Sequence, residues 1–251
     1  MRGHFMVLLP LLLAAAPVAA QNYDSRDEAR YRNCLTQTRL KPADAFESAL
    51  AWRDSGGGAP ALHCAAMALI ELKQFRQAAE RLEKLAELMQ REGSPLTPDM
   101  LGQAGNAWLL ANAPDRAYQV FSAGLALAPE HVELLIDRGR SLGMQGDWAG
   151  ARKDLDHALQ LAPDREDAYA FRASARRQAG DKEGALEDVE TALAIRDDDV
   201  DALLERGILR LARGDKAGAR ADWLKVRLLE PNTPAADAAG KELELLDVKV
   251  P

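Results

Sequence analysis

The stretch GDWAGARKDLDHALQLAPD, from Gly146 to Asp164, has two close counterparts further along the chain. GDKEGALEDVETALAIRDD begins at Gly180 and GDKAGARADWLKVRLLEPN begins at Gly214, so each copy starts 34 residues after the one before. A fixed period of this length indicates a chain built from stacked copies of one supersecondary unit. One such unit cannot bury its own apolar face, so each copy supplies the surface that covers its neighbour.

Each copy reads as a helix, a turn and a second helix. The Gly that opens each copy suits the left-handed residue that ends one helix, and the Asp after it suits the N-cap of the next helix. Apolar residues then recur at the spacing of one helical face. In the first copy these residues are Ala151, Leu155, Ala158 and Leu159. The helix before the turn carries a small residue at its middle in four units, namely Gly105, Gly139, Ala173 and Gly207.

These features resemble the tetratricopeptide repeat family, whose 34-residue hairpin has a small residue in its first helix (helix A) and an Ala-led stripe in its second (helix B). The best match is residues 132–165, with Gly139, Gly146, Trp148, Ala151, Leu155, Ala158 and Pro163. Units at 98–131, 166–199 and 200–233 are in register with it, and a weaker unit spans 59–92. The resemblance implies an all-α protein, a right-handed α-solenoid of these repeats. A degenerate helix pair over residues 21–58 precedes the array, and residues 234–251 supply a capping helix and a tail.

Three units depart from the family pattern in helix A. They have Arg directly before the small residue and Asp 16 residues later, as Arg138 with Asp154, Arg172 with Asp188, and Arg206 with Asp222. The two units that have Ala65 and Ala104 in place of the Arg also lack the Asp. Because a partly desolvated guanidinium and carboxylate need each other, we expect structural ion pairs between helix A and helix B. An arginine ladder for an anionic ligand is the functional alternative.

The N-terminal residues resemble a secretory signal peptide. Arg2 is followed by an apolar run from Phe5 to Ala16, which is shorter than the roughly 20 residues that a transmembrane helix needs. Val18 and Ala20 supply the small side chains of a cleavage site, so we expect cleavage after about Ala20. An N-terminal membrane anchor is the alternative. The mature chain is then periplasmic or secreted, with no further segment apolar enough to span a membrane.

The chain has two cysteines, Cys34 and Cys64. In an exported protein we expect them to form a structural disulfide, with free or redox-active thiols as the competing interpretation. Their spacing fits neither a CxxC motif nor a zinc site. His63 is adjacent to Cys64, but neighbouring residues on a helix point about 100° apart, which argues against a shared proton.

Composition and motifs argue against several classes of function. The 32 Lys and Arg are outnumbered by 39 Asp and Glu, a balance that disfavours nucleic acid as a partner. The sequence has no nucleophile elbow, phosphate loop, zinc-protease motif or dinucleotide fingerprint. His131 and His157 have no second histidine at ligand spacing. We therefore expect no metal, no cofactor and no enzymatic activity.

In the family, helices A line a concave face that binds peptides. Carried over residue by residue, that face consists of Met67, Ile70, Asn106, Leu109, Ile136, Arg140, Met144, Ser174, Arg177, Leu204 and Ile208. The strip is mainly apolar with a few hydrogen-bond donors, which suits a peptide helix or an extended segment. The alternative for any one of these residues is packing between neighbouring helices A. The C-terminal carboxylate clamp of some family members is incomplete, since only Asn106 matches it.

The sequence therefore predicts an exported scaffold that binds a protein or peptide partner through the concave face of its helices A, in an envelope-associated bacterial assembly. A small-ligand or solute-binding accessory protein of the periplasm is the alternative from a different class.

Overall fold

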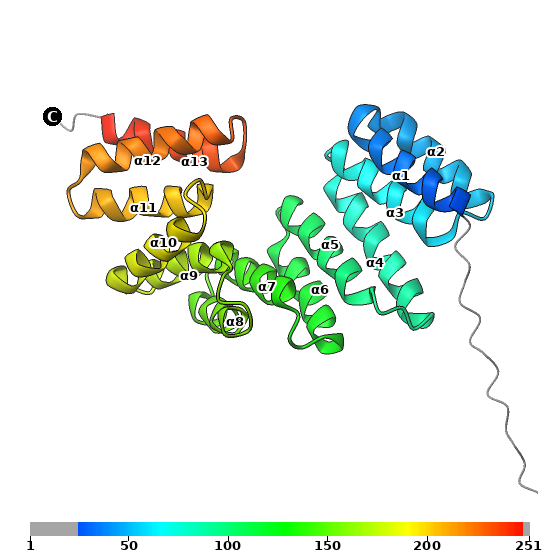
Figure 1. The fold of residues 1–251 in the computed structure, drawn as a ribbon, viewed down its shortest axis with the longest axis horizontal. Coiled ribbons are helices and arrows are strands. Elements are labelled where there is room, and N and C mark those ends of the chain that lie inside the picture. The colour runs from blue at the N-terminus through cyan, green and yellow to red at the C-terminus, as the bar shows by residue number, and fades with distance from the viewer. Residues whose placement is uncertain (1–24, 248–251) are drawn as a thin grey trace, which may run out of the picture.

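The computed structural model describes residues 25–247, so the expected signal peptide lies outside the described residues. This part of the chain forms 13 helices and no strands, arranged as a curved row (Figure 1). The helices are α1 (Ser25–Leu40), α2 (Pro42–Asp54), α3 (Gly58–Glu71), α4 (Phe75–Arg91), α5 (Thr97–Leu110), α6 (Pro114–Leu127), α7 (Val132–Met144), α8 (Trp148–Leu161), α9 (Glu166–Gln178), α10 (Lys182–Ile195), α11 (Val200–Ala212), α12 (Lys216–Leu229) and α13 (Pro234–Asp247). The expected all-α solenoid is confirmed.

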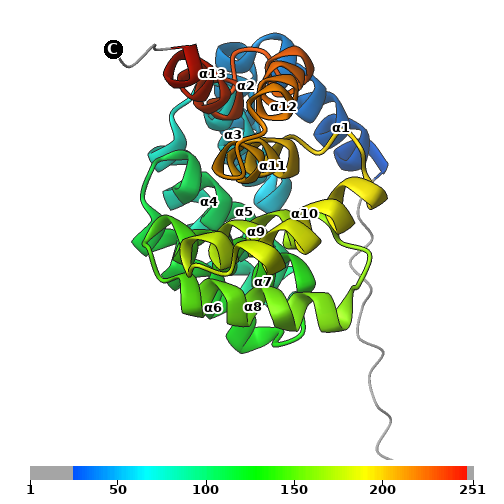
Figure 2. The ribbon, with the colours of Figure 1, turned by 90° about the vertical axis from the view of Figure 1, so that its left-hand side faces the viewer.

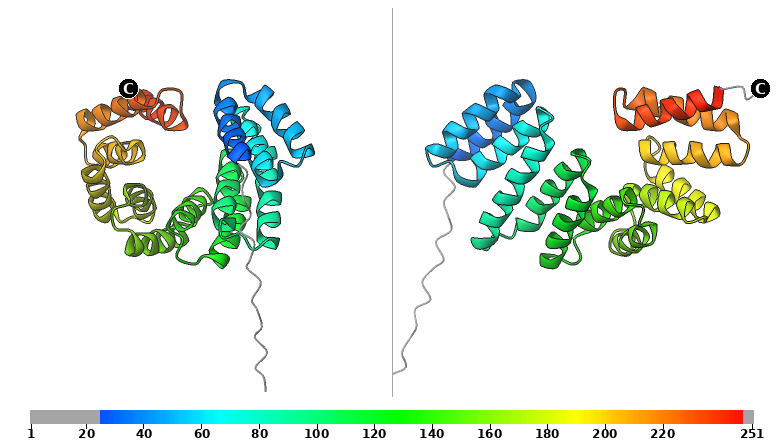
Figure 3. Two further views of the ribbon diagram at one scale, coloured as in Figure 1. Left: turned by 45° about the vertical axis from the view of Figure 1, so that its right-hand side comes forward. Right: turned by 180° about the vertical axis from the view of Figure 1, so that it is seen from behind.

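The helices pack in sequence order, two to each expected unit. In residues 132–165, α7 is helix A and α8 is helix B, and by the same rule α3, α5, α9 and α11 are helices A. Helix α5 also contacts α7, α7 contacts α9, and α9 contacts α11, whereas successive helices B make no comparable contacts. Helices A therefore form the inner edge of the curve. Helices α6 and α8 lie along the outer edge in both Figures 1 and 2, and Figure 3 shows that the row is an open arc.

The turns between helix A and helix B follow the Gly-Asp signal. Gly146, Gly180 and Gly214 have φ values of 82°, 90° and 86°, in the left-handed region that glycine adopts without strain. The following Asp is the N-cap of each helix B. Asp147, for example, accepts a hydrogen bond from the Gly150 backbone N–H at 2.9 Å.

The small residues of helix A allow a close approach of helix B. A Cβ placed on Gly105 would overlap the ring of Phe121, and one on Gly207 would overlap the indole of Trp223. Both aromatic side chains are fully buried. Helix B therefore packs a large ring directly against the backbone of helix A, which is why a small residue recurs there.

A buried bidentate ion pair joins helix A to helix B in three successive units. Arg138 Nε and Nη2 lie 2.7 and 2.8 Å from the carboxylate oxygens of Asp154. Arg172 binds Asp188 at 2.9 and 2.6 Å, and Arg206 binds Asp222 at 3.0 and 2.8 Å, in the same two-pronged geometry. The three aspartates are buried, at 6%, 3% and 4% exposed. Arg138 compensates the charge of Asp154, whereas Asp188 and Asp222 are each reached by a second arginine as well, Arg176 Nη1 at 3.3 Å and Arg210 Nη1 at 2.8 Å.

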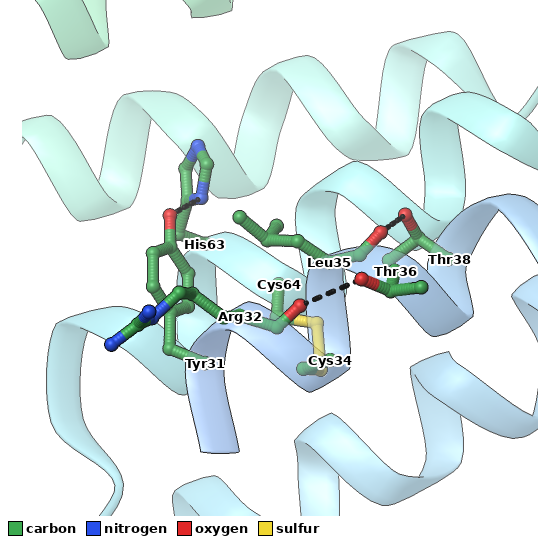
Figure 4. The surroundings of a disulfide bond; sticks show 8 residues. All are labelled: Tyr31, Arg32, Cys34, Leu35, Thr36, Thr38, His63 and Cys64. Atoms are coloured by element: carbon green, nitrogen blue, oxygen red, sulfur yellow. Dashed lines mark hydrogen bonds between the residues drawn. A yellow bond between two sulfur atoms is a disulfide. The ribbon is translucent and has the colours of Figure 1, made fainter. Parts of the chain in front are cut away.

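The N-terminal pair is fastened to the first repeat by a disulfide. Cys34 of α1 and Cys64 of α3 are bonded, with their Cα atoms 6.2 Å apart, and both are buried (Figure 4). Next to it, the ring of His63 lies between Tyr31 Oη, 2.6 Å from Nδ1, and Gln103 Oε1, 2.7 Å from Nε2. Because the amide oxygen only accepts, Nε2 donates to it and Nδ1 accepts from the tyrosine. The imidazole thereby connects α1, α3 and α5.

At the other end, α13 covers the last repeat. Ala239 and Leu243 are buried in the same apolar cluster as Trp223 and Val226 of α12. The opposite side of α13 faces solvent, where Leu245 is 67% exposed. The helix therefore ends the array by covering the apolar surface of α12.

We expect the ion pair Arg138–Asp154 to behave as a coupled unit. Arg138→Leu or Asp154→Leu alone strands a buried charge and should lower the free energy of unfolding by roughly 3 kcal/mol. The double variant removes both charges and should lose less than either single variant. Urea unfolding of the four proteins measures this, and additive losses would contradict the coupling.

We also expect the N-terminal region to lose stability in mild acid. Burial lowers the pKa of His63 below 6.5, with the Gln103 hydrogen bond acting in the opposite direction. The unfolded chain therefore takes up a proton at His63 before the folded chain does. The stability contributed by the neutral ring is complete above pH 6.5 and is lost as the pH falls below it.

Denaturant unfolding at pH 7.5 and pH 5 of the wild type and of His63→Gln tests this expectation. The variant should be less stable at pH 7.5 and should lose less stability between the two pH values. An identical pH dependence in the two proteins would contradict it.

Candidate functional site

The predicted partner-binding residues all lie on helices A. Met67 and Ile70 belong to α3, Asn106 and Leu109 to α5, Ile136, Arg140 and Met144 to α7, Ser174 and Arg177 to α9, and Leu204 and Ile208 to α11. Seven of the eleven form three groups, which are buried, internally bonded, or accessible around a cleft. The other four, Met67, Ile70, Leu204 and Ile208, are half-buried, and the last three of these pack against the apolar clusters.

Leu109 and Ile136 are buried and do not lie exposed on the concave face. Leu109 is 7% exposed and Ile136 is 2% exposed, and both belong to the main apolar cluster. They lie on helices that contact the next helix A, α5 with α7 and α7 with α9. Their burial favours the alternative of packing between neighbouring helices A for these two residues.

Asn106 and Arg177 are engaged inside the protein. The Asn106 side-chain amide donates to Asp137 Oδ2 at 2.7 Å, joining α5 to α7. Arg177 pairs with Glu205, a buried carboxylate on α11, through its Nε and through Nη2. Both side chains therefore link successive helices A, so neither is free to bind a partner without breaking an internal contact.

Arg140, Met144 and Ser174 are brought together at one cleft. It lies between α7, the start of α8 and α9, with a volume of about 290 Å³. Trp148, Ala151, Phe171 and Ala175 supply apolar walls, and Gly139 and Gly143 leave room on the α7 side. Met144 is 47% exposed. The Arg140 guanidinium lies 5.7 Å from the centre of the Phe171 ring, within the range of a cation–π contact.

The walls formed by Trp148 and Phe171 were not among the predicted contact residues. Trp148 is the first residue of helix B, and Phe171 directly precedes Arg172, one of the three helix A arginines that pair with an aspartate of helix B. The sequence signal was an aromatic residue at the start of helix B for Trp148 and an aromatic residue inside helix A for Phe171. The sequence did not show how α7 and α9 are placed relative to each other, and this placement forms the cleft.

Two carboxyl groups within range of Arg140 have raised pKa values. Burial raises the pKa of Asp137, while the Asn106 hydrogen bond and the charge of Arg140 lower it. The pKa of Asp201, at the start of α11, is also raised, by desolvation from the surrounding protein and by the charge of Asp199, and the charge of Arg140 opposes the shift. The curvature therefore places one arginine of α7 within electrostatic range of carboxyl groups on its own helix and two repeats further on.

The remaining histidine predictions concern metal ligands. His131 is the N-cap of α7, where its Nδ1 accepts from the Leu134 backbone N–H at 3.4 Å, and its Nε2 lies 3.0 Å from Asp99 Oδ1. Within residues 25–247 there is no group of three or more His, Cys, Asp or Glu side chains placed to hold a metal ion.

Over the same residues, none of the helices combines the length and the apolar character needed to cross a membrane.

Comparison with known proteins gives the same architecture. Residues 107–176, which include the whole cleft, match the model of the tetratricopeptide repeat family. A tetratricopeptide repeat protein from Parabacteroides merdae is similar in structure, with a TM-score of 0.69 and 19% identity over 90% of this chain and 86% of that one. A thermophilic TPR protein of Thermus thermophilus has a TM-score of 0.62 and 15% identity, over 76% of this chain and 100% of its own.

MamA from Desulfovibrio magneticus is a further structural match, with a TM-score of 0.55 and 20% identity over 70% of this chain and 97% of that one. No curated protein matches the chain in sequence. The hairpins and the inner face of helices A define a helical-repeat solenoid. Residues 107–176 match the tetratricopeptide repeat family, and the fold of the described residues is similar to that of tetratricopeptide repeat proteins.

The structure predicts that the internally bonded residues and the cleft residues respond differently to truncation. Arg177→Ala leaves the buried Glu205 carboxylate unpaired and should cost roughly 3 kcal/mol in the free energy of unfolding. Met144→Ala should change it by only about 0.5 kcal/mol, as is usual for an exposed position. Chemical denaturation measures both, and equal losses would remove the distinction between the two groups.

Proposed function

We propose that this protein is an exported scaffold that binds a protein or peptide partner through the concave face of its helices A, at the cleft between α7 and α9. The observation that carries the proposal is the combination of an accessible methionine with two aromatic walls at one place on the inner face. Methionine and aromatic side chains are adaptable and large contact surfaces for a partner's apolar residue.

The charges around the cleft indicate what the partner presents. Asp137 on α7 and Asp201 on α11 both lie within electrostatic range of Arg140, which itself lines the cleft. A segment with an apolar residue for the cleft and a basic residue for the acidic groups would complement both. The net charge of −7 on the whole chain favours encounter with such a segment.

Export and an envelope-associated assembly are supported by two features. The first 20 residues resemble a signal peptide, and the bond between Cys34 and Cys64 is consistent with an oxidising compartment. We place the mature chain in the periplasm or outside the cell on these grounds.

The alternative is a small-ligand or solute-binding accessory protein. The same cleft could hold a small apolar molecule, but its volume of about 290 Å³ is at the lower end of what ligand pockets enclose. A partner's side chain fits this space better than a whole solute does. The proposed activity is binding, and tetratricopeptide repeat proteins are typically non-catalytic scaffolds.

The test compares residues 21–251 with two folded variants in capture from envelope extract. The double change Met144→Glu and Ser174→Glu puts charges into the cleft. The matched control Leu228→Glu puts a charge on α12 at a residue that is 80% exposed. A partner retained by the wild type and the control, and bound roughly tenfold more weakly by the cleft variant once purified, would support the proposal.

Equal retention by all three proteins would show that the cleft is not the binding surface. If no protein is retained and apolar metabolites raise the melting temperature of the wild type but not of the cleft variant, the small-ligand alternative is correct.

A further inference from the structure

A second hollow lies on the outer side of the array, between the helices B of two successive repeats. It has a volume of about 810 Å³ and separates α6 from α8. Ser122, Leu125 and Ala126 line it from α6, Arg138 and Leu135 from α7, and Arg152, Lys153, Asp156 and His157 from α8. We call this space the α6–α8 groove. None of its lining residues belongs to the α7–α9 cleft.

The paired arginines of helix A, which we call the arginine ladder, show that this groove lacks one carboxylate. Arg172 binds Asp188 with two nitrogens, and its remaining Nη1 binds Asp156 at 2.7 Å. Asp156 lies 16 residues earlier, on the helix B of the preceding repeat. The arginine is therefore held between two carboxylates, one from its own repeat and one from the repeat before.

Arg138 has only the first of these two carboxylates. Its Nε and Nη2 bind Asp154, but the residue 16 positions earlier is Ser122, whose hydroxyl oxygen lies 3.4 Å from Nη1. The position that an aspartate carboxylate fills next to Arg172 is thus open next to Arg138, and it faces the α6–α8 groove.

Two more basic side chains line the same groove. Arg152 and Lys153 are exposed, and neither makes a hydrogen bond or ion pair with any residue among 25–247. The two acidic residues of the groove are already engaged, Asp154 by Arg138 and Asp156 by Arg172. The groove therefore has an excess of positive charge in a chain that is acidic overall.

This charge pattern is specific to one interval of the array. At the positions equivalent to Arg152 and Lys153, the next repeat has Leu186 and Glu187. The repeat after that has Arg220 and Ala221, and Arg220 is paired with Asp247 of α13. Among these three repeats, two unpaired basic residues next to an arginine that lacks its second carboxylate therefore occur only between α6 and α8.

We propose that the α6–α8 groove binds an acidic peptide segment of a partner, with one of its carboxylates on Arg138 Nη1 and further carboxylates on Arg152 and Lys153. The carboxylate takes the place that Asp156 occupies beside Arg172. This site is distinct from the cleft of the proposed function, which faces the opposite edge of the arc and complements a basic, apolar segment.

The experiment measures binding of a fluorescently labelled peptide of alternating Glu and Leu at low ionic strength. Its counterpart with Gln in place of Glu is the control probe. The wild type should bind the acidic peptide and not the amide peptide. In Ser122→Asp an internal carboxylate occupies Arg138, as in the next repeat, so binding should weaken by roughly tenfold while the melting temperature is kept or raised.

Ser122→Ala is the matched control and should bind like the wild type. The double change Arg152→Ala and Lys153→Ala should also weaken binding by roughly tenfold, because it removes the two free charges. The cleft variant Met144→Glu with Ser174→Glu should bind the acidic peptide normally, which separates this site from the proposed function.

The proposal is overturned by any of three results. The first is that the wild type fails to bind the acidic peptide. The second is that the amide peptide binds equally well. The third is that Ser122→Asp and the double variant Arg152→Ala with Lys153→Ala both bind the acidic peptide as tightly as the wild type does.

Discussion

The whole structure depends on the fact that a single helical hairpin has no way to bury its own apolar stripe. Residues such as Leu155 and Val189 are fully buried in an array in which each hairpin also packs against the next one. The close packing of helix B on helix A, which Gly105 and Gly207 permit, sets the thickness of each layer. Stability is then a sum of contacts between neighbouring layers, so every local feature of the chain serves either to make a hairpin or to join two of them.

The buried arginines add polar connections to this apolar stacking. An ion pair within a core is a weak source of net stability, but it penalises any packing that separates the partners. The aspartates of the ladder sit on helix B, the arginines on helix A, and Arg172 also reaches the preceding helix B. A register error between helices would leave these charges unpaired. The ladder therefore specifies how the hairpins are packed more than it strengthens them.

The 34-residue period and the Gly-Asp pair at each turn were sufficient to predict the helices, the turns at Gly146, Gly180 and Gly214, and the solenoid class. Short-range rules apply to these features, because they repeat within each hairpin. The inner face was harder to predict, since the accessibility of Leu109 or Ile136 depends on how tightly successive helices A approach. Contacts such as Asn106 with Asp137 and Arg177 with Glu205 cross between repeats. They depend on the curvature of the row, which a 34-residue period does not encode.

The two ends of the array are closed by different kinds of bond. At the N-terminal end, the covalent link between Cys34 and Cys64 ties α1 to α3 across the intervening helix α2. At the C-terminal end, α13 is held by alanine and leucine side chains and by an exposed ion pair between Arg220 and Asp247. In a row of units that each depend on their neighbours, the loosest terminus is where unravelling starts. The two ends of the array therefore differ, because a covalent bond holds the N-terminal helices and only noncovalent contacts hold α13.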